Sequence, residues 1–309
     1  MNRVSSLENL KTVLGKKGYG TIFCNRVKIF DKDIPNVYRC FKQGDASERV
    51  WIAKICQRKH MSSDPENTQE AEILSYLKKI GTASGQSHFR STLAMIKDAG
   101  SPSSHPDFTE FRRILYPEDI FLCDATVNIP FIVMKEYSHN LKYRLILEER
   151  ELKDNKDFMW HVFRQVTEAL AFLHFGYDAT TELGRKATQS GLEGWIPCTH
   201  GDVSDVNILV GDSGDNDLRT EFPNLRLSDF SEAKLHYAED KRDDDYDDTI
   251  VAQHAKTDLK MFAEGVLKGL GLEDKEPEWY KHLIEGTYTS KELVTVGPVG
   301  EELGVYKGE

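Results

Sequence analysis

The chain has 309 residues, 39% hydrophobic and 29% charged, an ordinary composition for a globular protein of one large or two small domains. Its formal net charge of −11 argues against general affinity for nucleic acids, because lysine and arginine drive that binding by neutralising phosphates. No stretch approaches the roughly 18 apolar residues of a membrane span, and the first residues lack an apolar leader, so we expect no membrane association. Five scattered cysteines without CxxC spacing are typical of reduced thiols, which favours a cytoplasmic or nuclear location.

The first part of the chain is rich in β-forming residues that turn residues interrupt, which predicts an antiparallel sheet. Ala71, Leu74 and Leu77 recur at helical spacing and predict an amphipathic helix over residues 66–80. The expected strands cover residues 21–24, 27–30, 37–41, 50–55 and 129–134, with a connection at residues 138–140.

The pattern then becomes helical, most clearly over residues 158–175, where apolar residues form a stripe. Two short strand-like pieces follow at residues 207–210 and 225–227, and polar residues stand at their ends. We expect loops at residues 176–197 and 211–223, a solvated acidic loop at residues 239–248, and one covering helix that contains Trp279, Tyr280, Leu283 and Ile284.

The polar residues at these strand ends read HGDVSDVN at residues 200–207 and DFS at residues 229–231. They resemble the catalytic loop HRDxxxxN and the magnesium loop DFG of protein kinases. Phosphoryl transfer needs a carboxylate against the acceptor hydroxyl and oxygen ligands that hold magnesium on the phosphates. The resemblance implies that Asp202 is the catalytic base, that Asn207 and Asp229 bind Mg²⁺, and that the cofactor is ATP.

Two further residues stand in the order that the kinase family requires. The segment VWIAK resembles the family's VAIK strand, which makes Lys54 the ammonium that contacts the α- and β-phosphates and places Ala53 at the nucleotide. On the following helix, Glu70 matches the partner of this lysine, with Glu72 as the alternative. Asp258 resembles the helix aspartate that braces the catalytic loop.

A phosphate-covering loop is expected near the start of the chain. Residues 14–22, LGKKGYGTI, resemble the family's LGxGxFGxV, although Lys17 replaces its second glycine. Glycines let backbone N–H groups approach phosphate oxygens closely. The resemblance therefore places five residues at the nucleotide, namely Gly15, Gly18, Tyr19, Gly20 and Ile22.

The segment FIVMKEY at residues 131–137 resembles the last sheet strand and the hinge of the family. Met134 stands near the gatekeeper position. Lys135, Glu136 and Tyr137 would offer backbone groups to adenine, and Leu209 is also expected at the nucleotide. A plain core strand is the alternative interpretation of this short apolar run.

The resemblance implies an α+β, two-lobed fold, with a nucleotide-binding lobe at residues 1–137 and a mainly helical catalytic lobe of reduced size at residues 138–309. The sequence departs from the family at Gly201, where the family has arginine, at Ser204, where it has lysine, and at Ser231, where it has glycine. No APE motif follows Asp229. These departures leave three functions open: a protein Ser/Thr kinase, a kinase for small hydroxyl compounds like the aminoglycoside and choline phosphotransferases, and a pseudokinase that binds nucleotide or a partner without turnover.

Overall fold

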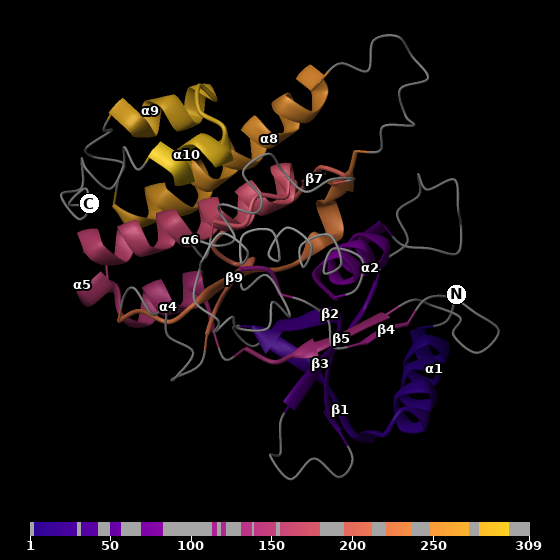
Figure 1. The fold of residues 1–309 in the computed structure, drawn as a ribbon. Helices are drawn as coiled ribbons and strands as arrows, with labels where there is room; N and C mark the ends of the chain where they lie inside the picture. Colours follow the sequence, from indigo (N-terminus) through magenta and orange to yellow (C-terminus); the bar gives the residue numbers. More distant parts are fainter. Residues whose placement is uncertain are drawn as a thin grey trace, which may run out of the picture. The chain divides into compact units, whose positions relative to one another are not determined.

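The computed structural model describes residues 3–29, 32–42, 50–56, 69–82, 113–115, 119–121, 131–137, 139–152, 155–179, 195–211, 221–236, 248–271 and 278–296. The chain is an α+β protein with antiparallel sheets and several helices (Figure 1). It divides into two compact units, Met1–Lys78 with Tyr116–Glu136 and Lys79–Leu115 with Tyr137–Glu309.

The first unit is built on a five-stranded antiparallel sheet with the order β1-β2-β3-β5-β4. Helix α1 precedes the sheet, and helix α2 lies between β3 and β4 in the chain. The elements are α1 (Arg3–Lys16), β1 (Tyr19–Ile29), β2 (Lys32–Lys42), β3 (Val50–Ile55), α2 (Gln69–Thr82), β4 (Asp119–Phe121) and β5 (Phe131–Lys135).

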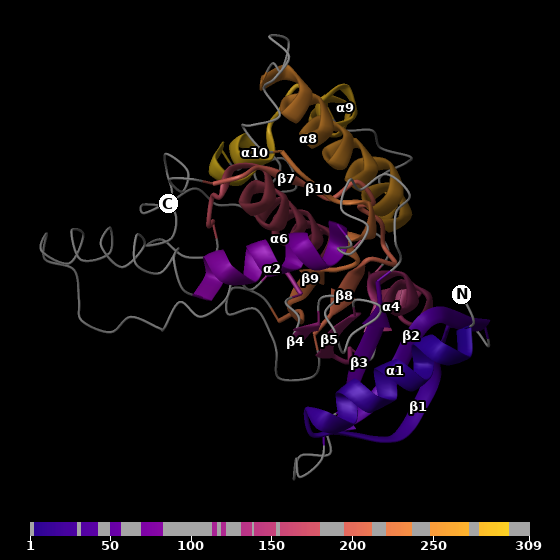
Figure 2. The ribbon, with the colours of Figure 1, turned by 90° about the vertical axis from the view of Figure 1, so that its right-hand side faces the viewer.

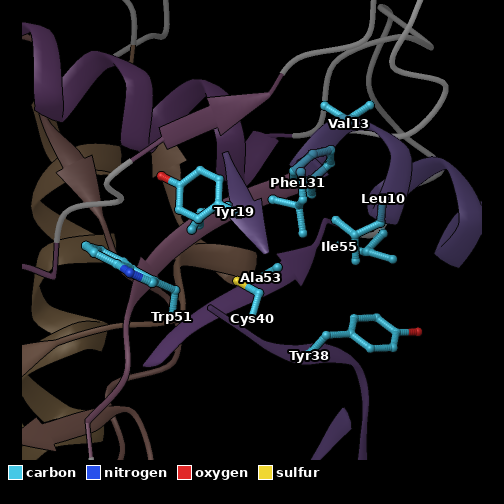
Figure 3. Close-up of a cluster of buried hydrophobic side chains, with 11 residues drawn as sticks. Leu10, Val13, Tyr19, Tyr38, Cys40, Trp51, Ala53, Ile55 and Phe131 are labelled. Atoms are coloured by element: carbon cyan, nitrogen blue, oxygen red, sulfur yellow. The ribbon is translucent and has the colours of Figure 1, made fainter. Parts of the chain in front are cut away.

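Side chains of β3 alternate strictly between the two faces of this sheet, because successive residues of a strand point in opposite directions. Trp51, Ala53 and Ile55 are buried on one face, where Leu10 and Val13 of α1 pack into the same cluster (Figure 3). Burial of each such leucine or isoleucine contributes about 1.5–3 kcal/mol. Helix α1 therefore covers one face of the sheet, a role that the sequence did not predict for it.

The second unit is built around the long helix α6, which Asn155 caps by accepting a hydrogen bond from Phe158 N–H at 3.0 Å. Helix α10 packs on α6 and α9 packs on α8 (Figure 2). The helices are α4 (Leu141–Leu147), α5 (Glu149–Leu152), α6 (Lys156–Phe175), α8 (Asp248–Phe262) with its π-helical and 3₁₀ extensions (Ala263–Leu267 and Lys268–Leu270), α9 (Glu278–Glu285) and α10 (Ser290–Val296).

Two small antiparallel sheets lie beside these helices. One has the order β6-β8-β9, and the other pairs β7 with β10. The strands are β6 (His139–Asn140), β7 (Cys198–Thr199), β8 (Ile208–Val210), β9 (Leu225–Leu227) and β10 (Lys234–Leu235), with the 3₁₀ turn η1 (Phe230–Glu232) before β10.

Buried polar side chains of α6 fix the position of β9. Gln165 Oε1 accepts a hydrogen bond from Leu225 N–H at 2.6 Å. Glu168 pairs with Arg113 at 2.8 Å, and both side chains are at most 4% exposed. Breaking one partner of such a pair typically costs about 3–5 kcal/mol, because the other charge stays buried. The pair therefore holds the segment around Arg113 against α6.

Several predicted elements are confirmed. The helix at 158–175 and the strands at 207–210 and 225–227 agree with α6, β8 and β9 within two residues. The two strands expected at 21–24 and 27–30 are one continuous strand, β1, and α10 was not predicted. The loops and the acidic run expected at 176–197, 211–223 and 239–248 lie mostly outside the described residues. Across the described part of the chain, none of the helices has the length and apolar character needed to cross a membrane.

In place of the expected loop, residues 14–22 form the end of α1, a turn and the start of β1, and their contact with a nucleotide stays a prediction. Gly15 lies inside α1, and Gly18 forms the left-handed turn (φ 79°) that ends this helix, with its N–H donating to Gly15 O at 3.2 Å. Tyr19, 1% exposed, packs edge-on against Trp51 in the α1 cluster. Gly20 and Ile22 belong to β1. The buried residues Leu10, Val13 and Leu14 of α1 run up to these glycines, so Gly15 belongs to the helix and Gly18 to the turn after it.

This arrangement predicts opposite effects for two glycines. Gly15→Ala replaces an exposed helical glycine and should raise the unfolding free energy by up to about 1 kcal/mol. Gly18→Ala forces a side chain into the left-handed region and should lower it by about 1 kcal/mol. Urea denaturation of both variants measures the difference. A destabilised Gly15→Ala variant would show that this residue is not helical.

Candidate active site

The expected catalytic loop, residues 200–207, runs from β7 to β8 in the second unit. The turn that follows β9 lies beside it. Ser228 N–H donates to Asn207 O at 2.9 Å, and the Ser228 hydroxyl donates to the same oxygen at 2.9 Å. Strand β7, which precedes the first segment, also pairs with β10, which follows the second. The structure thus brings together the two segments that the sequence singled out.

Asp258, on α8, holds the start of this loop. Its Oδ2 accepts a hydrogen bond from His200 N–H at 2.7 Å, and its Oδ1 accepts one from Gly201 N–H at 2.8 Å. His174 Nε2 donates to Oδ2 at 3.0 Å, and Ser290 Oγ lies 2.9 Å from His174 Nδ1. One carboxylate, 1% exposed, therefore fixes two successive backbone groups.

The charge of this carboxylate is stabilised although it is buried. Burial works to raise the pKa of Asp258, but the hydrogen bonds from His174 and from the His200 backbone outweigh it and lower the pKa. The loop is thus anchored by an ionised acceptor, which binds N–H groups more strongly than a neutral one.

His200 has a structural role in the loop. Its Nε2–H donates to Ser228 O at 2.9 Å, so Nδ1 carries the lone pair that accepts from Asp202 N–H at 3.3 Å. Burial lowers the pKa of this imidazole and keeps it neutral. Phe230 packs edge-on against the ring at 4.9 Å between centroids. Both nitrogens are engaged inside the protein, which leaves the general-base role to another residue.

Asp202 and Asn207 are joined directly. Asn207 Nδ2 donates to Asp202 Oδ2 at 2.8 Å and to the Asp202 backbone oxygen at 3.0 Å. This arrangement orients the amide, because its nitrogen faces Asp202 and its oxygen points elsewhere. The pair presents a carboxylate and an amide oxygen within one loop, and these are donor types that bind magnesium or a hydroxyl proton.

Asp229 follows β9 in a left-handed backbone conformation, with φ 61° and ψ 76°. A non-glycine residue in this region costs about 1–3 kcal/mol and persists only where neighbouring structure enforces it. Here Asp229 Oδ1 accepts from Ser231 N–H at 3.3 Å, and Phe230, 1% exposed, anchors the turn in the core. Such strain at a candidate ligand residue is typical of functional sites.

Gly201 explains one departure from the kinase pattern. Its φ is 77°, and a Cβ added there would lie 2.6 Å from Glu232 O. The arginine of the family could not occupy this position without moving the turn that follows Asp229. Ser204 also departs from the family, and its buried Oγ finds no hydrogen-bond partner among the residues described.

In the first unit, Lys54 and Glu70 form the contact that the sequence predicts. Lys54 Nζ lies 2.8 Å from Glu70 Oε1, and the two side chains are 19% and 5% exposed. Glu72, the alternative partner, is exposed. The ion pair fixes the ammonium of β3 against α2.

Ala53, expected at the nucleotide, does not share a face of the sheet with Lys54, because side chains alternate along β3. It is fully buried in the α1 cluster, on the face of the sheet opposite to Lys54. Ile52 and Met134 share the face of Lys54, because they pair directly across β3 and β5. The alternation of the strand therefore places Ile52, two positions before Lys54, on the lysine face, a position that the sequence analysis did not name.

The three expected hinge residues, Lys135, Glu136 and Tyr137, differ in their contacts and exposure. Glu136 N–H already donates to Val50 O at 3.2 Å, and its carboxylate pairs with Arg39 at 2.6 Å. Lys135 is exposed in β5. Tyr137 belongs to the second unit, where it contacts Arg226. The Glu136 N–H is thus engaged within the sheet, and the expected role of these residues toward adenine stays a prediction.

No protein-family model and no curated protein matches this sequence. Among solved structures, the chain is similar to one in the crystal structure of the yeast RNA Pol II CTD kinase CTDK-1 complex, with 14% identity and a TM-score of 0.33. The similarity covers 69% of this chain and 47% of that chain, so this protein spans about half the length of its neighbour.

The close approach of Gly201 to Glu232 O predicts that a methyl group at this position destabilises the fold. Gly201→Ala should lower the unfolding free energy by about 1–3 kcal/mol, because the added carbon meets a backbone oxygen and the backbone is left-handed. Gly269→Ala is the matched control, since nothing lies within 4 Å of its Cβ. Urea denaturation compares the two. Equal stability of both variants would contradict the described turn.

The lowered pKa of Asp258 predicts that its contribution to the free energy of unfolding is lost in acid. Because its folded-state pKa is lowered, the contribution is present above the unfolded value, about 3.9, and is lost as the pH falls through the folded value. Asp258→Asn should lower the unfolding free energy at pH 7 by about 1–3 kcal/mol and should lose less on acidification than the wild type. Denaturation at pH 7 and below pH 4 measures this. An unchanged acid dependence would contradict the ionised anchor.

Proposed function

We propose that this protein is an ATP-dependent phosphotransferase that moves the γ-phosphoryl group of MgATP to a hydroxyl acceptor. The observation that carries the proposal is the direct pairing of Asp202 with Asn207 in a loop anchored by Asp258. In-line phosphoryl transfer needs a positioned carboxylate for the nucleophile and an oxygen ligand for the metal, and one loop carries both groups here.

Asn207 and Asp229 are proposed as the Mg²⁺ ligands. Magnesium binds through few protein oxygens and takes its other ligands from phosphates and water. The residues present fit this donor set: Asn207 Nδ2 faces Asp202, so its oxygen is the donor available to a cation, and strain holds the Asp229 carboxylate after β9. Within the described residues no group of three His, Cys, Asp or Glu could hold a metal ion. A cation here would depend on nucleotide phosphates.

Lys54 is proposed to contact the α- and β-phosphates. An ammonium paired with a carboxylate keeps its charge and a defined position, and phosphate oxygens can share its remaining N–H groups. Glu70, 5% exposed, is held by its helix and so limits the movement of Lys54. Asp202 is proposed as the base that accepts the acceptor's hydroxyl proton, a role that typically contributes about 10²–10⁴-fold in rate.

Ser or Thr side chains of a protein are the first candidate acceptors. A small hydroxyl compound is the second, and one observation favours it. Only residues 237–247 separate the last described residue after β10 from the start of α8, and this is where peptide-directed kinases build a substrate platform. Offering generic proteins and small alcohols in parallel with labelled ATP distinguishes the two.

Nucleotide binding is the first test of the proposal. A ligand that binds only the folded state stabilises it by about 2.7 kcal/mol at a hundredfold excess over Kd, so MgATP should raise the melting temperature. Asp229→Asn should weaken the magnesium-dependent part of this shift while leaving the fold intact. Asp205→Asn, on the same loop, is the matched control and should keep the full shift.

Two results would contradict the proposal. One is the absence of any thermal shift with millimolar MgATP. The other is an Asp229→Asn variant whose shift with MgATP equals that of the wild type.

A further inference from the structure

The β6-β8-β9 sheet has one buried face and one outward face. On the buried face lie Ile208 and Val210 of β8, at most 3% exposed, with Leu225 and Leu227 of β9. The residues between them, Leu209 and Arg226, are partly exposed and directly opposite each other in the register. Directly opposed residues share a face of the sheet. Leu209 and Arg226 are therefore neighbours on its outward face.

Arg226 is held on this face by an aromatic side chain. Its Nη1 donates to Tyr137 Oη, and its Cζ lies 5.4 Å from the centroid of the Tyr137 ring. Contact with both the hydroxyl and the ring restricts the guanidinium more than either contact alone. The outward face thus carries an apolar residue and a positioned cation side by side.

We propose that Arg226 is a base-contacting specificity residue of the nucleotide site. This inference rests on the proposed function, and it takes the nucleotide contact that the resemblance implies for Leu209 to be a contact with the base. Opposed side chains on a sheet have Cβ atoms about 4.5–5.5 Å apart, and the two fused rings of a purine are wide enough to reach from one residue to the next. A purine on Leu209 therefore extends over the Arg226 guanidinium.

The chemistry of the guanidinium suits this contact. It is planar and weakly hydrated, and it stacks on π-systems, whereas the lysine ammonium is compact and strongly hydrated. Stacking of arginine on a base adds a cation–π attraction that depends on the base and not on the phosphates. Arg226 should therefore favour ligands with a purine over ligands that carry phosphates alone.

Calorimetric titration with MgATP and with magnesium tripolyphosphate, which lacks the base, tests this role. Arg226→Gln should weaken MgATP binding about tenfold and leave tripolyphosphate binding unchanged. Arg226→Lys keeps the charge but should lose most of the same affinity. Tyr137→Phe keeps the ring and should lose less than Arg226→Gln. Arg144→Gln is the matched control, because Arg144 pairs with Glu148 on α4 and should leave both affinities unchanged.

The outcomes separate this inference from the proposed function. Equal weakening of both ligands would show a structural role for Arg226, and unchanged MgATP binding in Arg226→Gln and Arg226→Lys would show no contact with the base; either result overturns the inference and leaves the proposed function standing. A wild type that binds neither ligand overturns both. Melting temperatures of the ligand-free variants verify that each one folds.

Discussion

The candidate catalytic loop depends on one buried carboxylate. Asp258 joins two successive backbone N–H groups of the loop to α8, and His174 brings α6 to the same oxygen. Ser290 adds α10 through the second nitrogen of His174. The loop, α6 and α8 therefore meet at the carboxylate of Asp258, and α10 is joined to it through His174. Because an unpaired buried charge is costly, these contacts form together, and the position of Asp202 follows from them.

Two unusual backbone conformations shape what this anchor supports. Gly201 and Asp229 are both left-handed, and Gly201 packs so closely against Glu232 O that a side chain there has no room. The loop and the turn after β9 are consequently fitted to each other. Phe230, packed on the neutral His200 ring, adds an apolar link between them. The strain at Asp229 is thus offset by packing that also orders the catalytic loop.

The sequence predicts that Asp202 and Asn207 lie in one short loop before a strand, but it did not predict the direct hydrogen bond between their side chains. Ala53 could not be placed by motif matching alone, since the strand period assigns the Lys54 face to Ile52. The glycines at 15 and 18 fitted a motif, but the apolar stripe of α1 decides their structure. Contacts such as Arg113 with Glu168 join residues far apart in the chain and leave no local pattern.

The central claim, phosphoryl transfer through Asp202, is tested most directly with ATP labelled on the γ-phosphate. Transfer to the chain itself, to generic proteins and to small alcohols is measured for the wild type, Asp202→Asn and Asp205→Asn. The account predicts that the first variant loses about 10²–10⁴-fold in rate while MgATP still raises its melting temperature, and that the second keeps the wild-type rate. Wild-type transfer by Asp202→Asn, or no transfer by the wild type to any acceptor, would contradict it.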